Sequence, residues 1–206
     1  GVETARFFTA IPEQYKLLDE LPIQFPLFVK PANAANSDGI DRNSFVVSFA
    51  GFQTKVKELY SIYKEPVLVE EYLSGREFTV SIIQADTMLV APIEIIAPLE
   101  NDIRILSKEI KSKDKEDLKE ITDINIYKKI SKIAILAFKA LGARDFGRID
   151  IKMDAHERCY FIEANLTPGM TRGSSYFPLS YELSSLIQYD EVLTLIVQSA
   201  LKRNDL

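Results

Sequence analysis

The sequence is 206 residues long, with 47% hydrophobic and 27% charged residues and a formal net charge of −5, which is ordinary for a globular protein. One cysteine and one histidine exclude a disulfide framework and a His-rich metal site, and no apolar run reaches the ~18–20 residues of a membrane helix. The basic residues are densest between 108 and 119, where acidic residues interleave with them. We therefore expect a cytoplasmic protein that binds neither nucleic acid nor membrane.

The first part of the chain, up to residue 73, predicts a small α+β unit. Ser48 is a good helix N-cap, because the apolar residues from Phe49 to Tyr63 keep helical spacing. A buried strand runs up to Lys30 and is followed by a loop of small polar residues. The expected elements are a helix over 12–20, a strand over 25–29, a helix from 49 and a strand over 67–69.

The second part, residues 74–206, predicts a larger α+β unit, so the fold class is α+β with subdomains 1–73 and 74–206. A strongly amphipathic helix ends at Gly142, and a segment rich in Gly, Pro, Ser and Thr over 167–178 predicts a loop. We expect residues 98–123 to form a long charged loop, which in a compact domain is usually functional or mobile. The remaining expected elements are strands over 78–83, 88–96, 146–153 and 159–164, and helices over 127–141 and 190–202.

The last two strands predict a hairpin with one polar face. Alternation along the first strand places three polar side chains together: Arg148, Asp150 and Lys152. On the second strand, Phe161, Glu163 and Asn165 share a face. If 154–157 is a simple four-residue loop, Arg148 pairs with Glu163 and Asp150 lies diagonal to Glu163, with α-carbons ~7–8 Å apart.

These residue types favour a magnesium site on the hairpin. Mg²⁺ takes hard oxygen ligands, and beside nucleotides it uses one or two carboxylates together with phosphate oxygens. Asp150 and Glu163 supply carboxylates, Asn165 adds an amide oxygen, and Arg148 suits a phosphate. The alternative is a solvated face with two acids and an arginine. The Glu-x-Asn opposite Arg-x-Asp, followed by a Pro-Gly loop, favours the metal.

Four segments carry a family resemblance. Phe146–Asp150 (FGRID) and Phe161–Thr171 (FIEANLTPGMT) resemble the signature of ATP-grasp ligases of the D-alanine–D-alanine ligase type. Upstream, Pro26–Pro31 resembles their phosphate-contacting strand, and Val67–Thr79 resembles their adenine hinge and ribose-binding acid. The segments occur in family order and span nearly the whole chain. The resemblance implies an ATP-grasp fold, two α+β subdomains with nucleotide between them.

Carried over residue by residue, the resemblance implies contacts to ATP from both parts of the chain. The phosphates are contacted by Lys30, Ser37 and Lys111. The adenine edge is lined by Glu70, Glu71 and Leu73. Glu77 accepts hydrogen bonds from the ribose hydroxyls, although as a residue at the start of a strand it is equally well explained as a surface acid. In this chain Ala35-Asn36-Ser37 replaces the family's Gly-Ser-Ser phosphate loop.

The resemblance also implies roles in the reaction. Arg148 stabilises the transferred phosphoryl group, and two Mg²⁺ ions, with Mn²⁺ as the alternative metal, are held by Asp150, Glu163 and Asn165. Gly169 and Ser174 border the acceptor site, although turn formation explains Ser174 as well. ATP phosphorylates a carboxylate to an acyl phosphate, which an amine attacks to form an amide. Such chemistry depends on positioning and charge neutralisation rather than on a protein nucleophile.

The substrates are small and amino-acid-like, but their identity stays open, because the acceptor loop Arg172–Tyr176 is one residue longer than usual. Two alternatives remain: a ligase for other amino acids or a secondary metabolite, and a nucleotide-binding module that has lost catalysis. The resemblance further implies an N-terminal domain and a second nucleotide-contacting lysine ahead of Gly1. We therefore expect residues 1–206 alone to be inactive, and a homodimer is left open.

Overall fold

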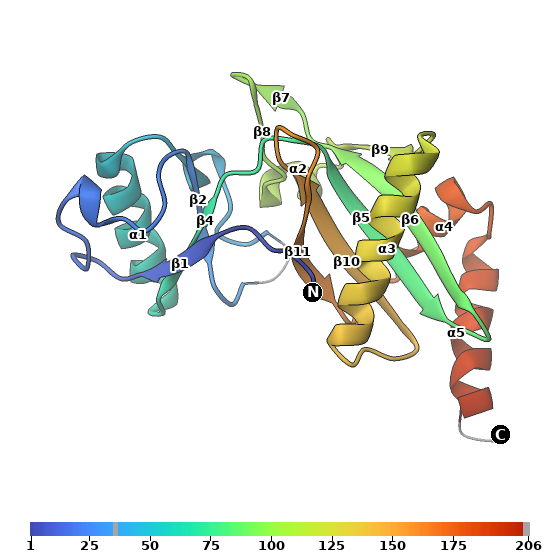
Figure 1. Cartoon of the computed structure of the whole chain (residues 1–206). Helices are drawn as coiled ribbons and strands as arrows, with labels where there is room; N and C mark the ends of the chain where they lie inside the picture. Colours follow the sequence, from blue (N-terminus) through green and yellow to red (C-terminus); the bar gives the residue numbers. More distant parts are fainter. Residues whose placement is uncertain (35–36, 204–206) are drawn as a thin grey trace. The chain divides into compact units, whose positions relative to one another are not determined.

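The computed structural model of the chain describes residues 1–34 and 37–203, which form two compact units (Figure 1). The larger unit contains Gly1–Thr4, Gly75–Ile96 and Asp117–Leu206. The smaller unit contains Ala5–Ser74 and Ala97–Glu116. These limits differ from the expected boundary at residue 73, because the chain crosses from one unit to the other more than once. Each unit has its own sheet and its own core.

The smaller unit is a four-stranded sheet covered by one helix. Its strands lie in the order β1-β4-β2-β3. The elements are β1 (Phe7–Ala10), β2 (Leu27–Pro31), β3 (Phe45–Val46), α1 (Phe49–Tyr63) and β4 (Val67–Glu71). As expected, the Ser48 side chain caps α1 by accepting a hydrogen bond from the Gly51 amide. Phe52, Val56 and Leu59 of α1 are buried against the sheet and form its core with Val29 and Val69.

The predicted helix over 12–20 is wrong. This segment contains only turns and a short 3-10 helix, η1 (Leu18–Glu20). Glu13 has φ of 65°, outside the right-handed helical region, and the Ile11 amide donates to the Gln14 side chain instead of entering a helix. Strand β1, which pairs antiparallel with β4, was also not expected from the sequence.

Residues 97–116 belong to the smaller unit, although the sequence places them in the larger subdomain. They form β7 (Leu99–Glu100), β8 (Ile103–Arg104) and α2 (Lys108–Ser112), where a loop was expected. Leu106 is buried, Arg42 pairs with Glu100 at 3.4 Å, and Lys108 pairs with Asp38 at 2.6 Å. Two buried apolar side chains, Ala97 and Leu106, and polar contacts, rather than a periodic apolar pattern, therefore hold the segment to its unit.

The larger unit is built on a five-stranded antiparallel sheet in the order β11-β10-β5-β6-β9. Its strands are β5 (Glu77–Gln84), β6 (Met88–Ile96), β9 (Asp117–Glu120), β10 (Phe146–Met153) and β11 (Cys159–Asn165). Its helices are α3 (Ile124–Ala140), α4 (Tyr176–Ser184) and α5 (Tyr189–Arg203). Neither β9 nor α4 was expected, because β9 lies within the charged segment and α4 begins within the predicted loop.

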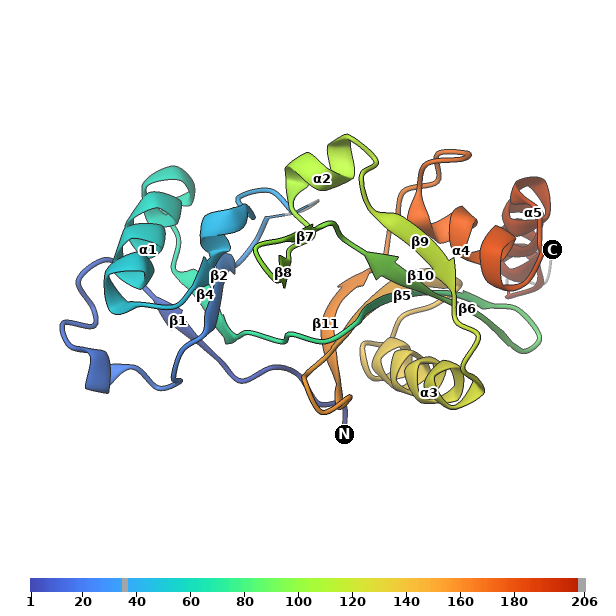
Figure 2. The ribbon, with the colours of Figure 1, turned by 90° about the horizontal axis from the view of Figure 1, so that it is seen from above.

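The helices lie on opposite faces of this sheet (Figure 2). Ile130, Ala134 and Phe138 of α3 pack on the face that carries Val80 and Ile149. On the other face, Phe177 and Tyr181 of α4 form a second buried cluster with Ile83, Ala91 and Val192. Alternation along β5 therefore places residues 77, 79 and 81 on the α4 face with Ile83, closer than Ile83 to the start of the strand.

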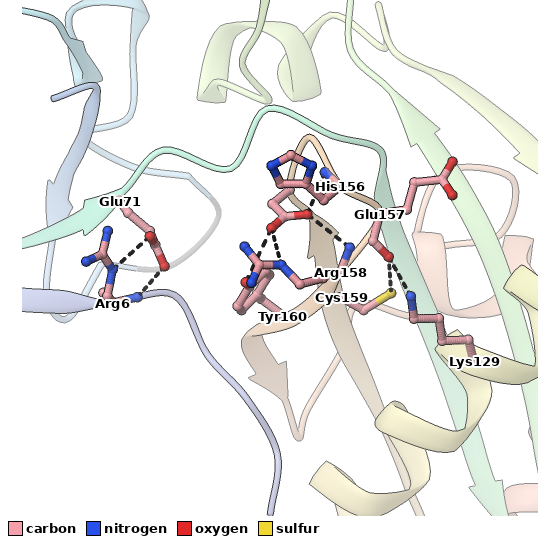
Figure 3. Close-up of polar contacts among 9 residues, drawn as sticks. Arg6, Glu71, Lys129, His156, Glu157, Arg158, Cys159 and Tyr160 are labelled. Atoms are coloured by element: carbon pink, nitrogen blue, oxygen red, sulfur yellow. Dashed lines mark hydrogen bonds and ion pairs between the residues drawn. The ribbon is translucent and has the colours of Figure 1, made fainter. Parts of the chain in front are cut away.

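The register of the β10–β11 hairpin differs from the prediction. Met153 pairs with Cys159, and a bulge between Asp150 and Ile151 leaves Ile162 as the extra residue on β11. The turn is longer than expected because the Asp154 carboxylate accepts hydrogen bonds from the His156 and Arg158 amides (Figure 3). As a result Asp150 lies directly opposite Glu163, not diagonal to it.

Because of the bulge, the Phe161 side chain lies on the opposite face of the sheet from the one expected. Without it, Phe161 would share a face with Glu163 and Asn165, as strict alternation predicts. In the structure Phe161 packs against the α3-side core together with Ala164. The extra residue, Ile162, thus lets β11 bury an aromatic ring on one face and still present two polar side chains on the other.

Candidate functional site

Three neighbouring strands of the larger unit place polar side chains opposite one another on one sheet face. Antiparallel pairing of β10 with β5 and with β11 sets Asp150 between Thr79 and Glu163. In the same way Arg148 lies between Ser81 and Asn165, and Lys152 lies opposite Glu77. We call this set the polar ladder: Glu77, Thr79, Ser81, Arg148, Asp150, Lys152, Glu163 and Asn165. Strand register fixes the backbone position of each member.

Asp150 is the most highly bonded member of the polar ladder. Its residue is only 8% exposed, and its Oδ1 accepts a 2.6 Å hydrogen bond from the buried Thr79 hydroxyl. Arg148 donates from Nε to Oδ1 and from Nη2 to Oδ2, both at 3.0 Å. The Asn165 amide donates to Oδ2 at 3.3 Å. A buried carboxylate with this many donors is held in one orientation.

Arg148 lies between two carboxylates and an aromatic ring. Its Nη2 is 3.0 Å from Asp150 Oδ2 and 4.0 Å from Glu163 Oε1, and its Cζ lies 5.4 Å from the centre of the Tyr176 ring. Burial acts to lower the pKa of Arg148, but the charge of Asp150 and its hydrogen bonds outweigh burial and raise that pKa. The guanidinium is therefore a permanent positive charge on this face.

The outer edge of the polar ladder has the donors that a hard cation needs. The Glu163 side chain is 51% exposed, and Asn165 Nδ2 donates to its Oε1 at 3.1 Å. Two carboxylates and one amide group thus converge at Asp150, Glu163 and Asn165. Among residues 1–34 and 37–203, no group of three or more His, Cys, Asp or Glu forms a metal cage. The donor set fits a Mg²⁺ ion that takes its other ligands from phosphate and water.

Glu77 forms an ion pair at the other end of the polar ladder. Lys152 Nζ lies 2.7 Å from Glu77 Oε2, and the two side chains are 17% and 24% exposed. Glu77 was expected from the sequence as a nucleotide contact, whereas Lys152 was given no role. Thr79 and Tyr176, which contact Asp150 and Arg148, were not expected. Alternation from Glu77 would have placed Thr79 on this face, whereas no local pattern reveals Tyr176.

In the smaller unit the structure brings two of the expected nucleotide contacts together. Lys30 Nζ is 2.7 Å from Glu70 Oε2, with side chains only 14% and 11% exposed. Glu71 is engaged differently: its carboxylate accepts hydrogen bonds from the Arg6 amide and from Arg6 Nε, at 2.9 and 3.0 Å (Figure 3). Leu73 is buried.

The remaining expected residues lie in loops or a short helix. Ser37 has φ of 57° and begins a turn in which its carbonyl accepts a hydrogen bond from the Ile40 amide. Ala35 and Asn36 lie outside the described residues. Lys111 is in α2 of the smaller unit. In the larger unit, Gly169 lies so close to Ser175 that a Cβ would sit 2.8 Å from its Oγ, and the Ser174 amide donates to the Thr171 carbonyl.

The segment FIEANLTPGMT, which runs from β11 into the following loop, resembles a family signature, and comparison with known proteins shows which family the chain belongs to. Residues 3–198 match the family described as D-ala D-ala ligase C-terminus. The chain belongs to this family. Among curated relatives, the D-alanine–D-alanine ligase of Hydrogenovibrio crunogenus is 27% identical over 95% of this chain and 60% of its own length. That of Buchnera aphidicola is 30% identical over 89% of this chain and 57% of its own.

Solved structures of family members share the fold. D-alanine–D-alanine ligase from Bacillus anthracis, complexed with ATP, superposes with a TM-score of 0.72, covering 99% of this chain and 62% of that one at 24% identity. The VanG D-Ala:D-Ser ligase of Enterococcus faecalis gives 0.71 at 22% identity, covering 95% of this chain and 56% of that one. The expected ATP-grasp fold is confirmed. This chain spans about 60% of the curated relatives it matches. Within the described ranges, no helix combines the length and hydropathy of a membrane span.

Proposed function

We propose that this chain is the ATP- and Mg²⁺-binding part of an ATP-dependent carboxylate–amine ligase of the D-alanine–D-alanine ligase type. The observation that carries the proposal is the polar ladder, in which Asp150, Glu163, Asn165 and Arg148 converge on one rigid sheet face. Phosphoryl transfer needs fixed positive charge and metal ligands, and this face supplies both. The curated relatives favour this ligase over the alternatives of a different product or a module without catalysis.

The proposed roles follow the chemistry of each side chain. Asp150, Glu163 and Asn165 hold Mg²⁺, with Mn²⁺ as an alternative, and the metal neutralises charge on the phosphates when bound. Arg148 stabilises the transferred phosphoryl group, because its guanidinium is charged and pinned in place. In the present contacts Arg148 and Asn165 N–H groups occupy the carboxylate oxygens. A metal bound at these oxygens therefore competes with those donors for carboxylate lone pairs.

Further roles rest on the family membership. We propose that Lys30, Ser37 and Lys111 contact phosphate and that Glu77 accepts from ribose. The adenine-edge residues are Glu70, Glu71 and Leu73. Since the Glu71 carboxylate is already engaged by Arg6, we assign its side chain to holding the hinge strand and only its backbone to the adenine. Gly169 and Ser174 border the acceptor site. In this assignment the smaller unit contacts the base and the phosphates. The larger unit provides the metal ligands, the ribose contact and Arg148 for the transferred phosphoryl group.

The partners are proposals of the same kind. We propose small amino-acid-like substrates, an N-terminal domain of the same polypeptide that completes the substrate site, and a cytoplasmic location. A homodimer remains an open prediction. The division into an adenine-and-phosphate subdomain (1–73) and a metal-and-acceptor subdomain (74–206) also stays a proposal, amended by the place of residues 97–116 in the smaller unit.

Melting of three proteins tests the proposal: wild type, Glu163→Gln and, as the matched control, Asp154→Asn. Mg²⁺ with a non-hydrolysable ATP analogue should stabilise the wild type by about 2.7 kcal/mol when the ligand is at about 100 times its dissociation constant. Glu163→Gln should lose most of the Mg²⁺-dependent part, because the substitution removes a metal ligand and nearly preserves shape. Asp154→Asn, at the hairpin turn, should keep it. An unchanged Mg²⁺ response in Glu163→Gln would mean that the carboxylates are solvent-facing side chains and do not bind the metal.

Calorimetric titration with the same analogue tests the smaller unit. Lys30→Ala should weaken nucleotide binding, because the substitution removes the largely buried ammonium, held 2.7 Å from Glu70, that is proposed to contact the phosphates. Lys57→Ala, on the outer side of α1, is the control and should bind as the wild type does. Equal affinity in Lys30→Ala and the wild type would remove Lys30 from the site.

A further inference from the structure

We infer that Lys152 is a positioning residue that holds Glu77 for the ribose and thereby sets the preference of the site for ribose over a sugar without hydroxyls. The inference rests on the proposed function, because it takes Glu77 as the ribose acceptor. Neither the sequence motifs nor the family match gives Lys152 a role.

The first support is geometry. Lys152 and Glu77 are direct cross-strand partners in the β10–β5 pairing, and their charged atoms are 2.7 Å apart. Both side chains are more than three-quarters buried. Backbone register on two central strands therefore sets the two residues opposite one another, and the 2.7 Å ion pair holds the lysine side chain against Glu77. The ammonium is bonded to Oε2, and within residues 1–34 and 37–203 no hydrogen bond is made to Oε1, whose lone pairs can accept hydrogen bonds from a ligand.

The second support is the charge pattern of the polar ladder. Glu77 is diagonal to Asp150 across the strand pair, a relation that places α-carbons ~7–8 Å apart. Arg148 and Lys152 flank Asp150 at two residues on either side, so cations alternate with the three carboxylates of the polar ladder. Arg148 donates two hydrogen bonds to Asp150 and is paired with it. Lys152 is thus the cation that neutralises Glu77 and keeps it from repelling Asp150, a role that an apolar side chain at 152 cannot fill.

Two ligands separate a sugar contact from general destabilisation: ADP and 2′,3′-dideoxy-ADP, each titrated with Mg²⁺ by calorimetry. A hydrogen bond from a hydroxyl to a fixed carboxylate predicts that the wild type binds ADP about tenfold more tightly than the dideoxy form. Lys152→Met should bring this ratio towards one, because Glu77 is no longer held. Lys152→Arg should keep it, since the cation remains. Lys119→Met, on β9 of the same sheet, is the control and should keep it too.

Further variants test whether Glu77 is the group that accepts hydrogen bonds from the sugar hydroxyls. Glu77→Gln should lose the ratio as Lys152→Met does, and the double variant should lose no more than either alone. Lys152→Gln, which stays polar, replaces the methionine variant if that one does not fold. An unchanged ratio in Lys152→Met or Lys152→Gln, including equal weakening of both ligands, overturns the inference. A wild type that binds both ligands equally also overturns it. A wild type that binds neither nucleotide overturns the proposed function itself.

Discussion

The α3 face of the five-stranded sheet in the larger unit is apolar, whereas the polar ladder on the other face is charged, although the same strands carry both. On the α3 face, Ile149 and its neighbours are fully buried in a dry apolar core. On the other face, Asp150 is the neighbour of Ile149 in sequence, yet it belongs to a hydrogen-bonded network of charges. Under the proposed function, residues of one strand therefore alternate between the apolar core and the ligand-binding face. Substitutions on the α3 face should lower stability without changing ligand affinity.

Ile149→Ala should give the largest loss of stability. Ile149 is fully buried beneath α3, and removing its side chain leaves a cavity that a tightly paired central strand cannot close. We expect a loss of about 3–4 kcal/mol in the free energy of unfolding, measured by urea denaturation. Nucleotide affinity of the folded protein should stay near that of the wild type. A large loss of affinity at preserved stability would show that the two faces are not separable.

Asp150→Asn should lose stability and ligand binding together. The substitution leaves Arg148, whose side chain is 12% exposed, without its close carboxylate. We expect about 2 kcal/mol, below the ~3–5 kcal/mol of a fully isolated buried pair, because Glu163 remains 4.0 Å away. The Mg²⁺-dependent rise in melting temperature with the ATP analogue should vanish. Full retention of that rise would place the metal elsewhere.

Thr79→Val should have a smaller effect on the same face. It keeps the shape but removes the 2.6 Å hydrogen bond to Asp150. We expect about 1.5 kcal/mol in urea unfolding, since the acceptor is charged and three other donor groups still hold it. Mg²⁺-dependent nucleotide binding should weaken rather than vanish. If Thr79→Val abolished binding, the orientation of Asp150 would depend on Thr79 rather than on the whole network.

Asp154→Asn should leave both faces intact and change only the response to acid. Burial acts to raise the pKa of Asp154, but hydrogen bonds from Arg158 and His156 outweigh burial and lower it from 3.8 to about 2. Because the folded-state pKa is depressed, the carboxylate stabilises the fold above 3.8, and this stabilisation is lost as pH falls through about 2. Urea unfolding should depend less steeply on pH in this window for Asp154→Asn than for the wild type. An identical pH dependence would mean that the Asp154 contacts are equally present in the unfolded chain.

The elements predicted correctly are those set by interactions between residues close in sequence. The helix after Ser48, the strands of the β10–β11 hairpin and the helix that ends before Gly142 were predicted, because capping and periodicity are local. The predicted helix over 12–20 and the predicted loop over 98–123 failed. In the first, a positive φ at Glu13 overrides the proline signal, and in the second, ion pairs such as Lys108–Asp38 order a segment with little apolar pattern.

The sequence by itself determined the family, the fold class and the four residues that converge on the hairpin, since strand alternation and residue type are both local properties. Only the tertiary structure decided which of them touch. A bulge at Ile162 moved Glu163 from the diagonal to directly opposite Asp150, and β5 brought Thr79 and Glu77 alongside β10 from about 70 residues away. Register and long-range pairing depend on how a whole turn and a neighbouring strand pack. No window of sequence contains that information.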